Sequence, residues 1–76
     1  MNKRRSNRIR SRLALLTPRE QQVYSCLARG ATNRQIGSAL GISSRTVEKH
    51  VGRILVKLGV ENRTRAALLM KRVNQN

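Results

Sequence analysis

Gly41 divides residues 32–59 into two segments, each with apolar side chains three or four residues apart. That spacing is typical of one face of an α-helix, and glycine is the usual residue where a helix ends in the left-handed conformation. The stretch therefore predicts a short helix, a tight turn and a longer helix, the arrangement called a helix-turn-helix. Gly37 lies inside the first helix, where glycine is unfavourable, and indicates a close approach to its neighbour.

Capping signals extend this pattern to four helices. Thr17-Pro18-Arg19-Glu20 has the pattern of a capping box, and Ser43 and Asn62 are predicted caps further along the chain. The expected helices cover about 18–29, 32–40, 44–58 and 62–73, with the helix-turn-helix proper at about 33–58. Because 76 residues permit one small domain, we expect a compact all-α four-helix bundle.

The charge of the chain indicates the class of its partner. The sequence has 17 Lys and Arg residues against 3 Asp and Glu, a net charge of +14. A short chain this basic is most simply explained by a polyanion. Tyr24 is the sole aromatic residue, so the chain lacks a platform on which single-stranded bases could stack. Double-stranded DNA is therefore the expected partner.

Residues 1–12 hold six of the seventeen basic residues and no acid. Such a block is typical of a flexible segment, so we expect an arm or linker there and a folded domain over residues 13–76. A basic arm can lie along DNA phosphates or enter the minor groove. The alternative is a solvated linker to an upstream domain.

The composition argues against an enzyme. His50 and Cys26 are the sole histidine and cysteine, and no paired carboxylates accompany them, so we expect no catalytic residue, metal or cofactor and no small-molecule ligand. No apolar run approaches the roughly 20 residues of a membrane span, and the N-terminus lacks the apolar segment of a secretory signal. We therefore expect a cytoplasmic protein without a membrane partner.

Residues 16–73 resemble the LuxR-type helix-turn-helix domain of bacterial transcription regulators. The resemblance rests on LTPRE at 16–20, GATNRQIGSALGIS at 30–43 and SRTVEKHVGRILVKLGVENRTRAA at 44–67. It implies a compact four-helix domain whose third helix enters the major groove and whose fourth helix often forms the dimer contact. Gly37 and Arg65 depart from the family, which usually has alanine and an acid there.

Three residues in the N-terminal half of the 44–58 helix are predicted to contact bases: Arg45, Glu48 and Lys49. Lysine and arginine can donate to guanine O6 and N7, and glutamate can accept from cytosine N4. An intrahelical pair with Arg45 is the alternative for Glu48. Gly52 stands where relatives often carry a longer reading side chain, which favours dependence on DNA shape.

A second set is predicted to contact phosphates because its members lie near helix N-termini or on the outer face of the 44–58 helix. This set comprises Thr32, Asn33, Arg34, Ser44, Thr46, His50, Arg53 and Lys57. Alternatives remain for three of them. Thr46 can simply face solvent, His50 is also expected to pack beside Val47 and Ile54, and Lys57 can complement the helix dipole.

The last predicted helix carries the candidate dimer contact, formed by Arg63, Ala67, Leu69 and Met70. The leading hypothesis is a sequence-specific, double-stranded DNA-binding transcription regulator that acts as a homodimer through helix 62–73. RNA polymerase is a further candidate partner. The alternative is a helix-turn-helix-shaped protein-interaction module that modulates the transcription machinery or another regulator.

Overall fold

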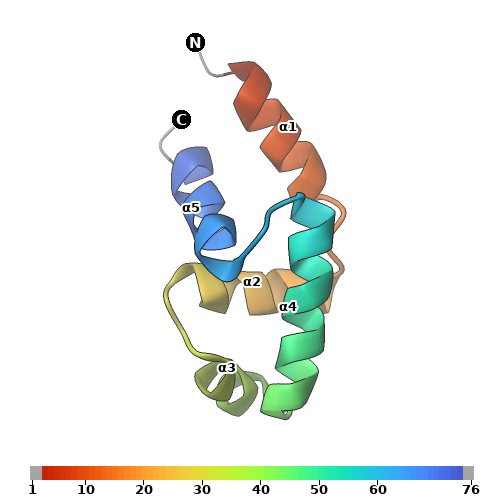
Figure 1. Ribbon diagram of the computed structural model, residues 1–76, viewed down its shortest axis with the longest axis vertical. Coiled ribbons are helices and arrows are strands. Elements are labelled where there is room, and N and C mark those ends of the chain that lie inside the picture. The colour runs from red at the N-terminus through yellow and green to blue at the C-terminus, as the bar shows by residue number, and fades with distance from the viewer. Residues whose placement is uncertain (1–2, 75–76) are drawn as a thin grey trace.

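A computed structural model of the chain describes residues 3–74, with side chains from residue 8 to residue 72 (Figure 1). The described residues form only helices: α1 (Lys3–Leu13), α2 (Pro18–Ala28), α3 (Asn33–Leu40), α4 (Ser44–Leu58) and α5 (Arg63–Asn74). The predicted all-α class is confirmed, and each bound of the four predicted helices differs from α2–α5 by at most one residue. Residues 1, 2, 75 and 76 of the predicted arm and domain lie outside the described residues.

Helix α1 adds a fifth helix to the predicted four and covers most of the segment for which an arm or linker is expected. Ile9 and Leu13 are four residues apart, so they share one face of the helix, and both are half-buried. This apolar pair was not predicted as part of a helix, because basic residues dominate the segment. Figure 1 shows α1 near the C-terminal end of α4, at the opposite end from α3.

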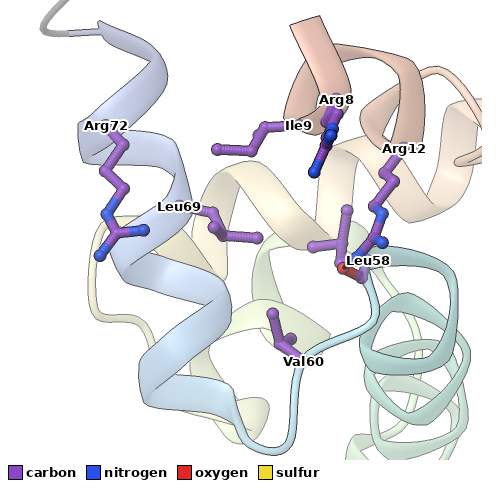
Figure 2. Close-up of a pocket in the computed structure, with 7 residues that line it drawn as sticks. All are labelled: Arg8, Ile9, Arg12, Leu58, Val60, Leu69 and Arg72. Carbon is purple, nitrogen blue, oxygen red and sulfur yellow. Dashed lines mark hydrogen bonds between the residues drawn. The ribbon is translucent and has the colours of Figure 1, made fainter. Parts of the chain in front are cut away.

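One arginine anchors α1 to the end of α4. The Arg12 guanidinium donates from Nη1 to the carbonyl oxygen of Leu58 at 2.9 Å. Leu58 is the last residue of α4, where carbonyl groups have no partner within the helix, so Arg12 satisfies one of them. Arg8, Ile9, Leu58 and Leu69 help to line a hollow of about 210 Å³ beside this contact. Figure 2 shows Arg12 reaching from α1 to Leu58, while Ile9 points toward Leu69.

The core lies where α2, α3, α4 and α5 meet. Its buried apolar side chains are Leu16, Val23, Tyr24, Leu27, Ile36, Val47, Val51, Ile54, Leu58 and Ala66. The Tyr24 hydroxyl donates to the carbonyl oxygen of Ala66 at 2.6 Å, which joins α2 to α5. Burial raises the pKa of Tyr24, so its hydroxyl stays protonated and continues to donate.

The turn between α3 and α4 depends on two glycines. Gly41 has a φ of 71°, in the left-handed region, and ends α3 as predicted. A Cβ atom on Gly37 would lie 2.6 Å from the carbonyl oxygen of Ile42, closer than packed atoms can approach. The close approach indicated by Gly37 is therefore confirmed, and it brings the start of α4 tightly against α3.

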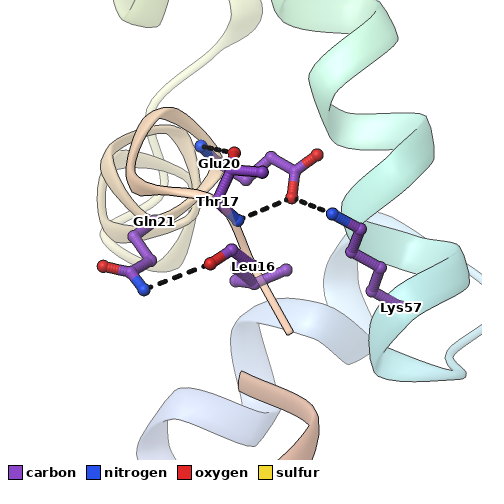
Figure 3. Close-up of polar contacts among 5 residues, drawn as sticks. All are labelled: Leu16, Thr17, Glu20, Gln21 and Lys57. Atoms are coloured by element: carbon purple, nitrogen blue, oxygen red, sulfur yellow. Dashed lines mark hydrogen bonds and ion pairs between the residues drawn. The ribbon is translucent and has the colours of Figure 1, made fainter. Parts of the chain in front are cut away.

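Glu20 is the one buried charged side chain among the described residues, with 2% of its surface exposed. Its Oε1 accepts from the backbone N–H of Thr17 at 2.9 Å and from Nζ of Lys57 at 2.6 Å (Figure 3). The Thr17 hydroxyl oxygen accepts in return from the Glu20 N–H at 3.1 Å. The predicted capping box is confirmed, and the same carboxylate also joins α2 to α4.

The pKa of Glu20 reflects opposing effects. Burial by itself raises the pKa, but the hydrogen bonds from Lys57 and Thr17 and the charge of Lys57 outweigh burial and hold the pKa below its usual value. The carboxylate is therefore ionised in the folded protein at neutral pH. Its interactions stabilise the fold above the ordinary glutamate pKa of 4.5, and this contribution is lost as the pH falls through the lower folded value.

Glu20→Gln should lower the free energy of unfolding at pH 7 by about 1–3 kcal/mol, because the neutral amide cannot form an ion pair with the Lys57 ammonium. The difference from the wild type should shrink as the pH falls below the ordinary glutamate pKa of 4.5 and through the lower folded pKa, where the wild-type carboxylate also becomes protonated. Urea unfolding followed by far-UV circular dichroism from pH 3 to pH 7 measures both effects. Glu48→Gln, at an exposed position, is the matched control. A loss in Glu20→Gln that is independent of pH would contradict the role of the charge.

Arg12→Met keeps most of the side-chain length and removes the hydrogen bond to the Leu58 carbonyl. We expect the free energy of unfolding to fall by about 0.5–1.5 kcal/mol, the usual net contribution of one hydrogen bond. Urea titration measures this change. Arg10→Met, at an exposed position of the same helix, should change the value by less than about 0.5 kcal/mol. Equal losses in both variants would mean that the Arg12 contact does not stabilise the fold.

Candidate nucleic-acid interface

Helix α4 separates a buried face from an exposed one. Val47, Val51, Ile54 and Leu58 turn into the core. The opposite face consists of exposed residues, namely Arg45, Glu48, Lys49, Gly52, Arg53 and Val56. The three predicted base-contacting residues therefore share the first two turns of this exposed face. Among the described residues, no ion pair joins Glu48 to Arg45, so the structure lacks the intrahelical pair that the sequence left open.

Helix α3 lies beside the N-terminal end of α4 (Figure 1). Thr32 caps α3: its hydroxyl accepts from the Gln35 N–H at 3.1 Å, and the Gln35 side chain accepts from the Thr32 N–H at 2.8 Å. This second capping box includes Gln35, which sequence reasoning did not single out. Arg34 is exposed in the first turn of α3, where the helix dipole also favours an anion.

Hydroxyl groups gather at the N-terminal end of α4. The Ser43 hydroxyl oxygen accepts from the Thr46 N–H at 3.0 Å and lies 2.9 Å from the Thr46 hydroxyl. Ser44 is also exposed. Thr46 therefore has a structural partner in the cap, while its side chain remains at the surface. These hydroxyl groups lie at the cap and in the first turn of α4, the same turn that carries Arg45.

His50 and Arg53 lie further along α4. His50 is half-buried, and among the described residues its buried Nδ1 has no hydrogen-bond partner. Arg53 is exposed. The described part of the chain contains no group of three or more His, Cys, Asp or Glu side chains that could hold a metal ion.

Lys57 differs from the predicted phosphate contacts. Its ammonium is paired with the buried carboxylate of Glu20 at 2.6 Å. A lysine in this position neutralises a charge inside the fold. The phosphate contact expected of Lys57 stays a prediction. The sequence did not indicate this pair, because the two residues are 37 positions apart.

Arg63 also has a role that the sequence did not indicate. It was predicted at a dimer contact, but its guanidinium donates to the side-chain oxygen of Asn33 and to the carbonyl oxygen of Ala31. Arg63 therefore joins the start of α5 to the start of α3 and orients Asn33, a predicted phosphate contact. The Asn62 side chain caps α5 by accepting from the Arg65 N–H at 2.9 Å.

The remaining residues of the predicted dimer contact lie partly inside the domain. Ala67, Leu69 and Met70 are half-buried and pack against the core. Leu68, which was not predicted, is the large apolar residue of α5 with the greatest exposure among the described side chains, at 49%. The described helices include none with the length and hydropathy of a membrane span.

Comparison with known proteins identifies the family. The chain is 46% identical over 61 residues to YhcZ of Bacillus subtilis, named as an uncharacterized transcriptional regulatory protein, and covers 28% of that protein. It is 44% identical over 64 residues to SgaR of Hyphomicrobium methylovorum, named as a probable transcriptional regulatory protein, and covers 30% of it. These matches span 80% and 84% of the present chain.

A shorter relative matches over most of its length. The chain is 38% identical over 61 residues to the spore germination protein GerE of Bacillus subtilis. This match spans 80% of the chain and 82% of GerE. Residues 14–70 match the family described as bacterial regulatory proteins, luxR family. The resemblance stated from the sequence is thereby confirmed, and the family is one of regulators and not of enzymes, as predicted. The chain belongs to the LuxR family of bacterial regulatory proteins.

Proposed function

We propose that this chain is a sequence-specific DNA-binding module of a transcription regulator and that α4 enters the major groove. The observation that carries this proposal is the exposed face of α4, which places Arg45, Glu48 and Lys49 on two successive turns. The major groove is wide enough for one α-helix, and the N-terminal residues of such a helix reach the base edges. The names of the relatives, transcriptional regulatory proteins, support the same function.

The chemistry of these three side chains suits base recognition. Arg45 and Lys49 supply donors for guanine O6 and N7, and the Glu48 carboxylate is an acceptor for cytosine N4. Glu48 also repels phosphate, so its place between two cations favours a base edge over the DNA backbone. The face therefore offers both donors and an acceptor to base edges, and this mixed pattern can distinguish sequences.

Phosphate contacts would hold α4 in the groove. We assign them to residues around the two helix N-termini and along α4: Thr32, Asn33, Arg34, Ser44, Thr46, His50 and Arg53. The net charge of +14 provides attraction that does not depend on sequence. Arg63 supports this set indirectly, because it holds the side chain of Asn33 at the start of α3.

We also propose that two copies bind together through α5. Leu68 is 49% exposed, beside the half-buried Ala67, Leu69 and Met70. An apolar side chain of this size at the surface can gain free energy by contact with a second copy. A two-fold dimer would place two α4 helices in successive major grooves on one side of the duplex.

Lys49→Ala should weaken binding to a preferred sequence by about 1–3 kcal/mol and relax the preference at one base position. Arg34→Ala should weaken binding to preferred and random duplexes by equal factors, because phosphates carry no sequence information. Selection of bound sequences from a random duplex pool supplies the preferred site, and fluorescence anisotropy measures both variants. Equal losses for Lys49→Ala on preferred and random DNA would contradict its role as a base contact.

Cooperative binding should depend on the spacing of two half-sites. Half-sites about one helical turn apart, ~34 Å, should be occupied together. Insertion of about five base pairs rotates one half-site by about half a turn and should abolish cooperativity. Leu68→Asp should have the same effect on the original spacing without changing affinity for a single half-site. Unchanged cooperativity after the insertion would exclude the dimer.

A further inference from the structure

Val56 is the most exposed large apolar side chain among the described residues, at 81%. It lies in the second half of α4, on the exposed face that carries Lys49 and Arg53. Single apolar residues are common on protein surfaces and need no special reason. At Val56, however, the surroundings indicate a role for the exposed side chain, because the residue one turn earlier is also unusual for an exposed helix face.

That neighbour is Gly52. A Cβ atom on Gly52 would meet no described heavy atom within 4 Å, so no packing contact within the domain requires a glycine. Glycine nevertheless weakens a helix interior, and valine is a poorer helix former than most residues of an exposed face. The fold therefore gains nothing visible from either residue, in contrast to Gly37, which a neighbouring carbonyl group requires.

Gly52 and Val56 line one open hollow on the outer face of α4. The hollow is also lined by Lys49, Arg53 and Lys57. Residues four apart on a helix are neighbours on its surface, so the apolar side chain of Val56 stands directly beside the space above Gly52. The site thus combines a place where an outside group can reach the helix backbone, an apolar wall and flanking cations.

We propose that this hollow receives the 5-methyl group of a thymine, with Val56 as a specificity-determining contact. The inference rests on the proposed function, in which this face of α4 meets the major groove. Gly52 lets the base edge approach the α4 backbone closely, and Val56 packs against the methyl. Thymine is the one base of DNA that presents a methyl group in the major groove. Lys49 and Arg53, which line the same hollow, supply positive charge that attracts the duplex.

The test removes the methyl from the DNA and the γ-methyls from the protein. A preferred half-site is first obtained with the full chain from a random duplex pool. Each thymine in it is then replaced in turn by deoxyuridine, which lacks the methyl and keeps the base-pairing edge. At one position the replacement should weaken wild-type binding about fourfold, equivalent to about 0.8 kcal/mol for one buried methylene-sized group.

Val56→Ala completes a double-mutant cycle. The variant should bind the thymine duplex about fourfold more weakly than the wild type and should be insensitive to deoxyuridine at that same position. Alanine is a better helix former than valine, so the domain should remain folded, which circular dichroism checks. Leu15→Ala is the matched control, because it truncates another exposed apolar residue, 61% exposed, between α1 and α2. It should retain both the wild-type affinity and the wild-type sensitivity to deoxyuridine.

The outcomes separate this inference from the proposed function. If the wild type tolerates deoxyuridine at every thymine, or if Val56→Ala keeps the wild-type sensitivity, the methyl contact is wrong although sequence-specific binding stands. If the random pool yields no preferred sequence, the proposed function fails and the methyl contact fails with it. A thymine whose methyl matters only when Val56 is present supports the inference.

Discussion

The ionised carboxylate of Glu20 joins α2 to α4, the helix that carries the candidate interface. A buried charge is tolerated only when it is paired and hydrogen-bonded, and Glu20 meets this condition through Thr17 and Lys57. The pair connects the start of α2 to the last turn of α4. Because the core holds the other face of α4 through Val47 and Ile54, the exposed face has a defined orientation relative to α3.

Two groups of the basic residues have different roles. Lys57 pairs with Glu20, Arg63 holds Asn33 and the carbonyl of Ala31, and Arg12 satisfies the carbonyl of Leu58. These three stabilise contacts between helices. The cations on the outer face of α4 and at the start of α3 are exposed instead. A positive charge in a folded domain is therefore not by itself a sign of a nucleic-acid contact, and the structure is needed to separate the groups.

Signals confined to a few neighbouring residues predicted most of the fold. The capping box at Thr17 and Glu20 and the stop at Gly41 placed helix ends correctly, because caps satisfy backbone groups within one turn. The apolar spacing along α4 also separated its buried face from Arg45 and the other candidate contacts. Helix α1 was missed, because the charge of its residues suggested disorder and its stability depends on contacts with α4 and α5.

The sequence by itself determined the all-α class, the positions of four helices and which face of α4 is exposed, since each depends on residues within a few turns of one another. Only the tertiary structure decided the docking of α1 and the structural roles of Lys57 and Arg63. The contacts of Arg12, Lys57 and Arg63 join residues 46, 37 and 30 positions apart. No local pattern encodes such pairs. They form because burial of the apolar faces brings the helix ends together and leaves polar groups there that require partners.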